Sequence, residues 1–449
     1  MGAFNLSMLR TRNALLMFST VAVLLASACG RPAKDATIAD VEQGIRSFID
    51  AETAAGDGYF RIVDDTLDMT LRLVRVHTEY LSVLGEGRYF ACVDLADSTG
   101  DVYDVDFFLT GDAGAMEVTK MTLHKRNGKP FYTWAQQSDQ TWSQVPISDA
   151  SKSLLGVVEG EDRFTFEYAV RLPLTAGRLW VPRPQSDAFQ DVSILSVDAP
   201  MPLLEVRDTV QGNLAFFGEL DALADPDASA ERTLTITCSV VRKEKSPYAG
   251  EVSLGDLTGS ADLPIGGRFA EIVDSVAVRG DSPLMNARRL YDYVIDNVRY
   301  AKQGKYGTGN ATFACDAKSG NCTEFHALFI SLARTAGIPA RFGIGASIPS
   351  ARNDGGTDGY HCWAEFHADG KWWPVDISEA DKYTALATYY FGHHPANRIE
   401  LSRGRDLAFE SGPTDGPIPF FAYPVFEPAD GAESMPLPAR FRFDRQRPV

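Results

Sequence analysis

The sequence predicts a multidomain α+β protein, in which an N-terminal α+β domain and a β-sandwich domain precede a C-terminal domain of helices and strands. Three patterns along the chain predict this. An amphipathic helix is followed by about a hundred residues of alternating apolar and polar side chains, which favour strands. Five strand-like runs come next, and helical spacing returns only after Pro264. A chain of 449 residues is also too long for one compact core.

Residues 1–29 are predicted to be a lipoprotein signal peptide. Arg10 and Arg12 precede an apolar stretch from Leu15 to Leu25, which suits a secretory segment and is short for a membrane span. Small residues then lead to Cys29, so the segment resembles a bacterial lipoprotein signal in which Cys29 is lipidated. Ordinary cleavage beside an incidental cysteine is the alternative. We therefore expect an exported protein on the periplasmic or cell-envelope face, anchored to a membrane by a lipid at Cys29.

The composition of the chain excludes some classes of partner. No stretch after the signal approaches the roughly 18 uninterrupted apolar residues that a membrane span needs. The formal net charge of -17 argues against nucleic acid and anionic surfaces as partners. No motif calls for a cofactor.

Residues 30–140 are predicted to form the N-terminal α+β domain. Residues 37–52 carry apolar side chains at helical spacing, at Val41, Ile45, Phe48 and Ile49. Period-two alternation follows, with turn signals at residues 85–87, 99–100, 111–114 and 127–128. One helix on an antiparallel meander has an outline similar to the cystatin-like folds.

Residues 141–260 are predicted to form the β-sandwich domain. A polar connector over residues 141–160 comes first. The strand-like runs after it are Phe164–Val170, Leu179–Pro182, Val192–Leu195, Leu214–Phe217 and Leu234–Val240.

Residues 261–430 are predicted to form the domain that carries the chemistry, and the Pro-rich residues 431–449 a tail. Helical spacing predicts helices over Phe269 to Val276 and over Pro283 to Val298. A glycine-rich loop, Gly304 to Gly309, precedes the next helix.

Cys322 begins a predicted helix over residues 322–336. Apolar side chains recur at helical spacing along one face of it, and Gly337 and Pro339 follow its end. Asn321 suits the N-cap. The first turn of a helix favours a thiolate because of its unpaired N–H groups and the positive end of the helix dipole, and those N–H groups can also bind an oxyanion.

A histidine and an aspartate are predicted to meet beside this cysteine. Asp369 and Gly370 predict a two-residue hairpin turn between apolar strands. In that register Asp376 lies opposite Trp363, and His361 lies two residues further along the same face. The aspartate can then orient the imidazole, whose other nitrogen faces the cysteine.

These residues stand within four motifs that together resemble the transglutaminase-like superfamily, which has a papain-like cysteine fold. The motifs are Gly320-x-Cys322-x-Glu324, the run from Arg334 to Arg341, His361-x-Trp363-x-Glu365 and Trp373-x-x-Asp376. The resemblance covers residues 280 to 385. It implies that the C-terminal domain is a papain-like transglutaminase core in which Cys322 is the nucleophile, His361 the base and Asp376 the orienting acid.

The resemblance also implies an enzyme that attacks amide carbonyls and passes through a thioester. If water attacks the thioester, the enzyme is a peptidase or amidase; if a primary amine attacks, it is a transferase that crosslinks proteins. Exported single-chain bacterial members lack the calcium-regulated multidomain layout of animal crosslinking enzymes. Hydrolysis of cell-envelope peptides or proteins is therefore expected, and a catalytically idle envelope binding module is the remaining alternative.

Residues near the nucleophile are further candidates. Tyr300 and Gln303 precede it in a region where the superfamily can place an oxyanion donor. His326 lies on the same helix face as Cys322 and is expected to be a structural histidine.

Two glutamates in the motifs have open roles. Glu324 and Glu365 either buttress the site or form ion pairs with Arg334 or Arg341. His393 and His394 are expected to lie in a solvated loop.

The chain has six cysteines, of which one belongs to the signal peptide. The odd number that remains leaves at least one thiol unpaired. Cys92 and Cys238 lie in strand-like apolar runs and are predicted to be buried small hydrophobes. Cys315 and Cys362 are candidates for a disulfide, and Cys322 is expected to be free. A zinc site built from the last three cysteines and a histidine matches no common ligand spacing, so no metal is expected.

Overall fold

The computed structural model describes residues 36–445, apart from gaps at 65–66, 86, 137–141, 147–155, 224–231, 303–305 and 383–385. The predicted signal peptide and Cys29 lie outside the described residues. The chain divides into two compact units, Met1–Ala150 and Ser151–Val449. In the described part of the chain, no helix has the length and apolar character that crossing a membrane requires.

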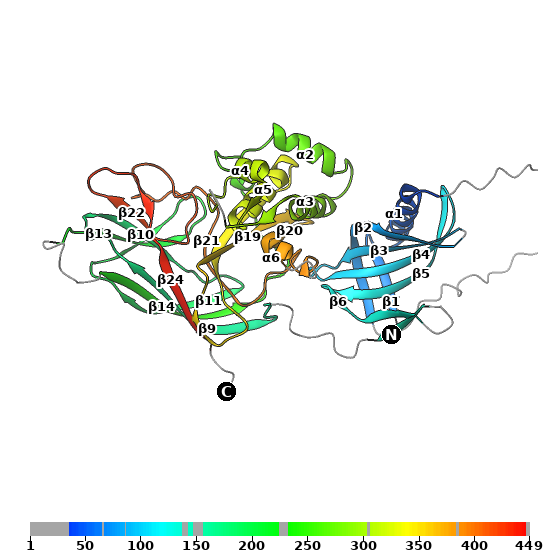
Figure 1. Ribbon diagram of the computed structural model, residues 1–449, viewed down its shortest axis with the longest axis horizontal. Coiled ribbons are helices and arrows are strands. Elements are labelled where there is room, and N and C mark those ends of the chain that lie inside the picture. Colours follow the sequence, from blue (N-terminus) through cyan, green and yellow to red (C-terminus); the bar gives the residue numbers. More distant parts are fainter. Residues whose placement is uncertain are drawn as a thin grey trace, which may run out of the picture. The chain divides into compact units, whose positions relative to one another are not determined.

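The first unit has one helix on a six-stranded antiparallel sheet (Figure 1). Helix α1 spans Ile38–Ala55 and starts with a capping box of Thr37 and Asp40. Its buried side chains are Val41, Ile45 and Ile49. The strands follow one another across the sheet: β1 Phe60–Asp64, β2 Leu67–Gly85, β3 Arg88–Ala96, β4 Val102–Asp112, β5 Ala115–Arg126 and β6 Lys129–Pro130. A separate hairpin pairs β7 Tyr132–Gln136 with β8 Trp142–Pro146. The predicted helix on an antiparallel meander is confirmed.

The four turn signals of this region each fall between two strands. At the last of them, Asn127 and Gly128 have φ values of 50° and 78°. Both lie in the left-handed region that a tight two-residue hairpin requires, and asparagine and glycine tolerate it best. The turn that the sequence indicated at Asn127 and Gly128 is therefore present.

The second unit contains two five-stranded sheets that form layers (Figure 1). Their orders are β12-β13-β10-β22-β23 and β11-β14-β9-β24-β18. All five runs predicted to be strands are strands, and the structure has one further strand, β12, which the sequence did not indicate. The strands are β9 Glu161–Arg171, β10 Gly177–Arg183, β11 Gln190–Asp198, β12 Leu204–Arg207, β13 Leu214–Leu220 and β14 Thr233–Lys243. Alternation along β9 buries Phe164, Phe166 and Tyr168, which is the pattern of a strand with one face in a core.

The C-terminal boundary of the sandwich differs from the prediction. Four of its strands come from residues assigned to the following domain or to the tail: β18 Asp354–Gly356, β22 Val425–Pro428, β23 Met435–Pro436 and β24 Ala439–Arg445. Strand β24 pairs with β9 on one side and β18 on the other, and buries Phe441 and Phe443. The prediction of a tail over 431–449 is thus wrong for residues 435–445, because proline content obscured an alternation of phenylalanine and arginine.

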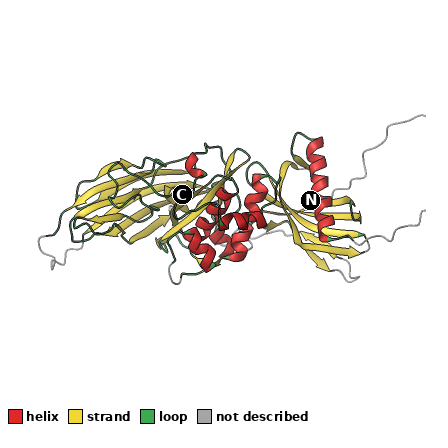
Figure 2. Cartoon of the chain, turned by 90° about the horizontal axis from the view of Figure 1, so that it is seen from above, coloured by secondary structure: helices red, strands yellow, loops and turns green. Residues whose placement is uncertain are grey.

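The rest of the second unit is a four-stranded antiparallel sheet with helices. The sheet has the order β20-β19-β17-β21, from Lys371–Val375, Tyr360–Ala368, Ala340–Ser347 and Arg398–Arg403. The helices are α2 Arg268–Val276, α3 Pro283–Asn297, α4 Ala311–Ala317, α5 Cys322–Thr335 and α6 Ile377–Lys382. A short parallel pair joins β15 Arg299–Tyr300 to β16 Ser319–Gly320. Figure 2 shows these helices gathered in one region of the molecule.

Helix α5 is the centre of this region. Every residue from Cys322 to Ala333 is buried, because α2, α3 and α4 pack around the helix as well as β19. The apolar face that the sequence indicated is thus buried, and the other faces of these turns are buried as well. A buried helix holds its first turn in a fixed place, which matters because that turn carries Cys322.

The predicted hairpin beside α5 is confirmed. Ala364 pairs with Val375 and Ala368 with Lys371, which is the register deduced from a two-residue turn. Asp369 and Gly370 have φ values of 53° and 74°, as such a turn requires. Asp376 follows β20 directly and begins the approach to α6.

A buried ionic network joins the sandwich to this sheet within the second unit. Lys245, which follows β14, donates to Glu365 on β19 at 2.8 Å and to Glu400 on β21 at 3.1 Å. Tyr248 and Arg341 also donate to Glu365, at 2.7 Å and 2.8 Å. Buried charges are tolerated only when they are paired in this way.

Candidate active site

Cys322 is the first residue of α5 and is buried. Asn321 caps the helix by accepting from the Thr323 N–H at 2.8 Å. The N–H of a first helical residue has no partner within the helix. The sulfur of Cys322 therefore lies where the helix dipole favours a negative charge and where N–H groups can meet an oxyanion.

Glu324 fixes the entry to this helix. Its carboxylate accepts from the Asn321 N–H at 3.0 Å and, across the glycine-rich loop, from the N–H groups of Gly307, Thr308 and Gly309 at 3.0, 2.9 and 3.0 Å. It forms no ion pair with either arginine considered from the sequence. Glu324 is thus the residue that ties the loop to the start of α5.

His361 and Asp376 meet as the hairpin register predicts. Nε2 of His361 lies 2.6 Å from Oδ2 of Asp376. The hydroxyl of Ser378 and the N–H of Glu379 donate to the other carboxylate oxygen at 3.1 Å and 3.2 Å. The aspartate is therefore held from both sides, and the Nδ1 side of the imidazole is left for the cysteine.

The side chains of Cys322 and His361 form a hydrogen-bonded pair that carries opposite charges. The pKa of Cys322 is lowered well below its usual value, first by a hydrogen bond from Cys362 and, against the effect of burial, by the hydrogen bond and positive charge of His361. Burial alone would lower the pKa of His361, but Asp376 and Cys322 raise it to about 9. At neutral pH the pair is therefore a thiolate beside an imidazolium.

The charge of Asp376 is stabilised by its surroundings. Burial would raise the pKa of this carboxyl group, but the charge and hydrogen bond of His361 hold it well below the ordinary value. Arg398, itself buried, lies 4.0 Å away. Asp376 stays ionised throughout the neutral range, as an orienting acid must.

Cys362 is a further neighbour of Cys322, whereas the sequence offered only a disulfide or a zinc ligand at this position. Its thiol donates to Cys322, and burial raises its own pKa well above the usual value, so it remains a protonated donor. Cys362 and His361 are adjacent on β19, which packs against α5, and both form a hydrogen bond with the sulfur of Cys322. Among the described cysteines all are free, so the candidate disulfide between Cys315 and Cys362 does not form.

His326 is a structural histidine, as expected. Its Nδ1 lies 2.7 Å from the carbonyl oxygen of Cys322, and its Nε2 accepts from the Ile377 N–H at 3.0 Å. Burial is the main cause that lowers its pKa. A neutral ring with a proton on Nδ1 satisfies both contacts, so His326 connects α5 to the start of α6.

Of the two candidate oxyanion donors, only Tyr300 lies among the described residues. The pKa of Tyr300 is raised to about 12, chiefly by burial and next by the charge of Cys322, which places the phenol within the electrostatic field of that cysteine. Gln303 falls in the gap at 303–305.

Other sequence expectations are settled by burial. Glu365 belongs to the ionic network with Arg341, which was one of its two predicted roles. His393 and His394 are buried, so the prediction of a solvated loop there was wrong. The ring of His394 packs on that of Trp363 with centroids 4.2 Å apart.

The arrangement has the parts that acyl transfer at a carbonyl requires. It holds a thiolate, an imidazolium that can deliver a proton, a carboxylate that orients the ring, and N–H groups at a helix start. A search of the described residues for a group of ligands that could hold a metal finds none at this site.

The part of the chain that contains this site is similar to known proteins. Residues 270–377 match the sequence model of the transglutaminase-like superfamily, and this range contains all three residues of the triad. A protein of Haemophilus influenzae, itself described as uncharacterized, is 26% identical over 318 residues, with 59% of this chain and 84% of that protein covered.

Two solved structures are also similar in part. A protein from Cytophaga hutchinsonii, provisionally described as a cysteine protease, has 13% identity and a TM-score of 0.42, covering 64% of this chain and 99% of its own. A protein from Parabacteroides distasonis, provisionally described as a protease, has 12% identity and a TM-score of 0.22, covering 64% of this chain and 63% of its own. Residues 270–377 of this chain therefore match the transglutaminase-like core, and all four motifs lie within the matched range.

Proposed function

We propose that this protein is an exported cysteine peptidase or amidase that opens amide bonds of cell-envelope peptides or proteins through a thioester on Cys322. The observation that carries the proposal is the contact of Cys322 at a helix start with His361, whose other nitrogen lies 2.6 Å from Asp376. The expected partners are a protein or peptide substrate and a membrane, and no cofactor takes part.

Acylation begins with the thiolate. Sγ of Cys322 attacks the amide carbonyl carbon, and the carbon–sulfur bond forms while negative charge develops on the carbonyl oxygen. The backbone N–H of Cys322, at the start of α5, stabilises that oxygen. The carbon–nitrogen bond then breaks as His361 gives its proton to the leaving amine, which leaves a thioester on Cys322 and a neutral imidazole.

Deacylation returns the enzyme to its first state. The neutral imidazole of His361 takes a proton from water, the oxygen attacks the thioester carbon, and the carbon–sulfur bond breaks. The products are a carboxylic acid, the Cys322 thiolate and the imidazolium. Asp376 keeps the ring in the orientation that both half-reactions need.

Amine transfer is the second candidate, because a primary amine can replace water in the second half-reaction without any change in the triad. The resulting enzyme would crosslink proteins.

An idle binding module is the third candidate function. The charged thiolate–imidazolium pair argues against it, since a binding function has no need of an activated thiol.

Product analysis separates these candidates. The purified protein is incubated with cell-envelope peptides, with and without a primary amine, and the products are identified by mass spectrometry. We expect new peptide fragments, absent with Cys322→Ala and present with Cys238→Ala, which alters a buried thiol in the sandwich. Amine conjugates without fragments would replace hydrolysis by transfer, and no product of either kind would favour the binding module.

We also propose that the lipid at Cys29 holds the enzyme on the cell-envelope side of a membrane. The apolar stretch and the small residues before this cysteine support the proposal. Cys29→Ala should release the protein from the membrane fraction into the soluble envelope fraction and abolish incorporation of labelled fatty acid. Unchanged fractionation and labelling would contradict a lipid anchor at this position.

A further inference from the structure

A second group of reactive side chains lies in the first unit. Cys92 is on β3 and Asp104 and Asp106 are on β4, where Cys92 pairs with Asp106 and Asp94 with Asp104. The residues that alternate with them on β3, such as Ala91 and Val93, belong to the core that α1 covers. Cys92 and the two aspartates therefore occupy the opposite face of the sheet. This corrects the prediction that Cys92 is a small hydrophobe in an apolar core.

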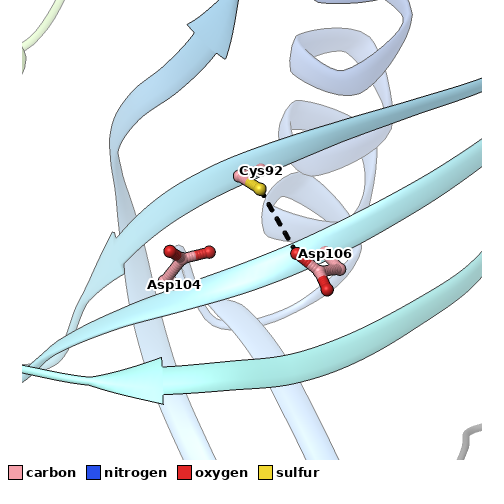
Figure 3. A group of neighbouring side chains, drawn as sticks. All are labelled: Cys92, Asp104 and Asp106. Atoms are coloured by element: carbon pink, nitrogen blue, oxygen red, sulfur yellow. Dashed lines mark hydrogen bonds between the residues drawn. The ribbon is translucent and has the colours of Figure 1, made fainter. Parts of the chain in front are cut away.

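The three side chains converge on a common space (Figure 3). One ligand atom from each, the sulfur and two carboxylate oxygens, lie within 4.8 Å of one another. Sγ of Cys92 is 3.3 Å from Oδ1 of Asp106. In a tetrahedral zinc site, the sulfur and oxygen ligands are about 3.6 Å apart, given the usual metal–ligand distances. The present spacing therefore fits such a site with only small movements of the side chains.

An unsatisfied oxygen points to a missing ligand. Asp104 is 8% exposed, and its Oδ2 accepts from Nζ of Lys125 at 2.9 Å. Its Oδ1 is buried and has no hydrogen-bond partner within the described ranges. The same holds for the hydroxyl of Thr122, which pairs with Asp106 across β4 and β5. Because a buried polar atom without a partner is costly, these atoms call for a group that the protein itself does not supply.

Imidazoles border the cluster. Nδ1 of His124 lies 3.5 Å from Oδ1 of Asp106, and Nε2 of His77 lies 3.2 Å from Oδ2 of Asp94. His124 is therefore a candidate for a fourth ligand, with water as the alternative. Cys92 is only partly buried, which leaves an approach to the sulfur.

We propose that Cys92, Asp104 and Asp106 form a binding site for a divalent transition-metal ion, with Zn²⁺ as the preferred occupant. Thiolate, carboxylate and imidazole are the ligands that zinc takes, whereas calcium and magnesium select oxygen alone. When the ion binds, the sulfur–metal bond forms and the thiol proton of Cys92 passes to solvent. The site is in the first unit and does not depend on the amide chemistry proposed for Cys322.

Cobalt titration tests this site because a thiolate bound to Co²⁺ gives a charge-transfer band in the near ultraviolet. The full chain carrying Cys322→Ala, which removes the other reactive thiol, is freed of metal with a chelator and titrated with Co²⁺. We expect the band to saturate at a single equivalent and to disappear when Zn²⁺ is added. Adding Cys92→Ser should abolish the band, whereas adding Cys238→Ser should leave it.

A second variant keeps the test decisive if Cys92→Ser does not fold. Asp104→Asn in the same background should weaken Zn²⁺ binding by at least about 100-fold, since even partners outside the ligand sphere contribute about 10- to 100-fold. Circular dichroism confirms that the variant is folded. Three results would each overturn the metal site. The first is the absence of a band in the Cys322→Ala protein, and the second is a band that survives Cys92→Ser. The third is an unchanged Zn²⁺ affinity in folded Asp104→Asn.

Discussion

Cys322 owes its charge to two neighbours rather than one. The sequence identified His361, but the largest influence on the pKa of the nucleophile is the hydrogen bond from the thiol of Cys362. A neutral thiol that donates to a thiolate stabilises the charge without adding a second one. Cys362 is thus a positioning residue that acts through Cys322.

This role predicts different outcomes for two substitutions. Cys362→Ala should raise the pKa of Cys322 and lower kcat/KM by about 10-fold, the size of one hydrogen bond to a charged group. Cys362→Ser, which keeps a donor, should restore most of the loss. The rate of thiol alkylation against pH reports the pKa directly. Equal effects of alanine and serine would show that Cys362 only fills space.

The pH profile tests the pairing of His361 with Asp376. Since the imidazolium must give up a proton during acylation, and its pKa is raised to about 9, kcat/KM should fall as pH rises through about 9. Asp376→Asn removes the negative charge that raises this pKa and replaces one carboxylate oxygen by an NH₂ group, so the alkaline limb should move to lower pH. The rate at neutral pH should fall by about 10⁴-fold, as the loss of an orienting aspartate does elsewhere. An alkaline limb that stays in place in this variant would contradict the assignment.

At the scale of elements, the start of α5 depends on a loop that the sequence could not place. Helical spacing predicted the helix, and Asn321 predicted its cap. No local pattern indicated that Glu324 would accept from four backbone N–H groups, because three of these belong to residues 307–309. Contacts between segments distant in the sequence are what periodicity cannot supply.

Glu324→Gln tests this contact. An amide offers one acceptor and turns its NH₂ toward donors, so buried N–H groups lose their partners at about 1–3 kcal/mol each. We expect urea unfolding to show a loss of at least about 2 kcal/mol and alkylation of Cys322 to become slower. Glu271→Gln, in the exposed first turn of α2, is the matched control and should change neither. A Glu324→Gln protein as stable as the control would remove Glu324 from this role.

Strand β24 carries a second prediction at this scale. Phe441 is 2% exposed and packs against Phe166 and Tyr168 of β9, with ring centroids 5.5 and 5.1 Å away. Phe441→Ala should therefore destabilise the protein by about 3–5 kcal/mol, measured by denaturant unfolding. Arg440→Ala, on the outward face of the same strand, should cost less than about 0.5 kcal/mol. Similar small effects of both would restore the prediction of a loose tail.

For the whole molecule, sequence and structure agree most where the information is local. The helix after Asn321, the hairpin at Asp369 and Gly370, and the meander of the first unit follow from caps, turns and period two. The composition of the sandwich did not follow, because β24 enters it from the far end of the chain. The partners of Glu365 and the place of Cys362 also depend on packing between distant segments.

The same distinction applies to the chemistry. The order of motifs indicated the triad and the superfamily, and the structure brings the three residues together. The cluster at Cys92 was missed because its members come from neighbouring strands with no ligand spacing along the chain.

The central claim is that Cys322 is a thiolate at neutral pH because it accepts a hydrogen bond from Cys362 and is paired with His361. The most direct measurement is the rate at which iodoacetamide modifies Cys322 as a function of pH, followed by peptide mass spectrometry. The account predicts modification near pH 6 much faster than that of a small-molecule thiol, and slower modification with His361→Ala. A rate near pH 6 no greater than that of the free thiol would contradict the claim.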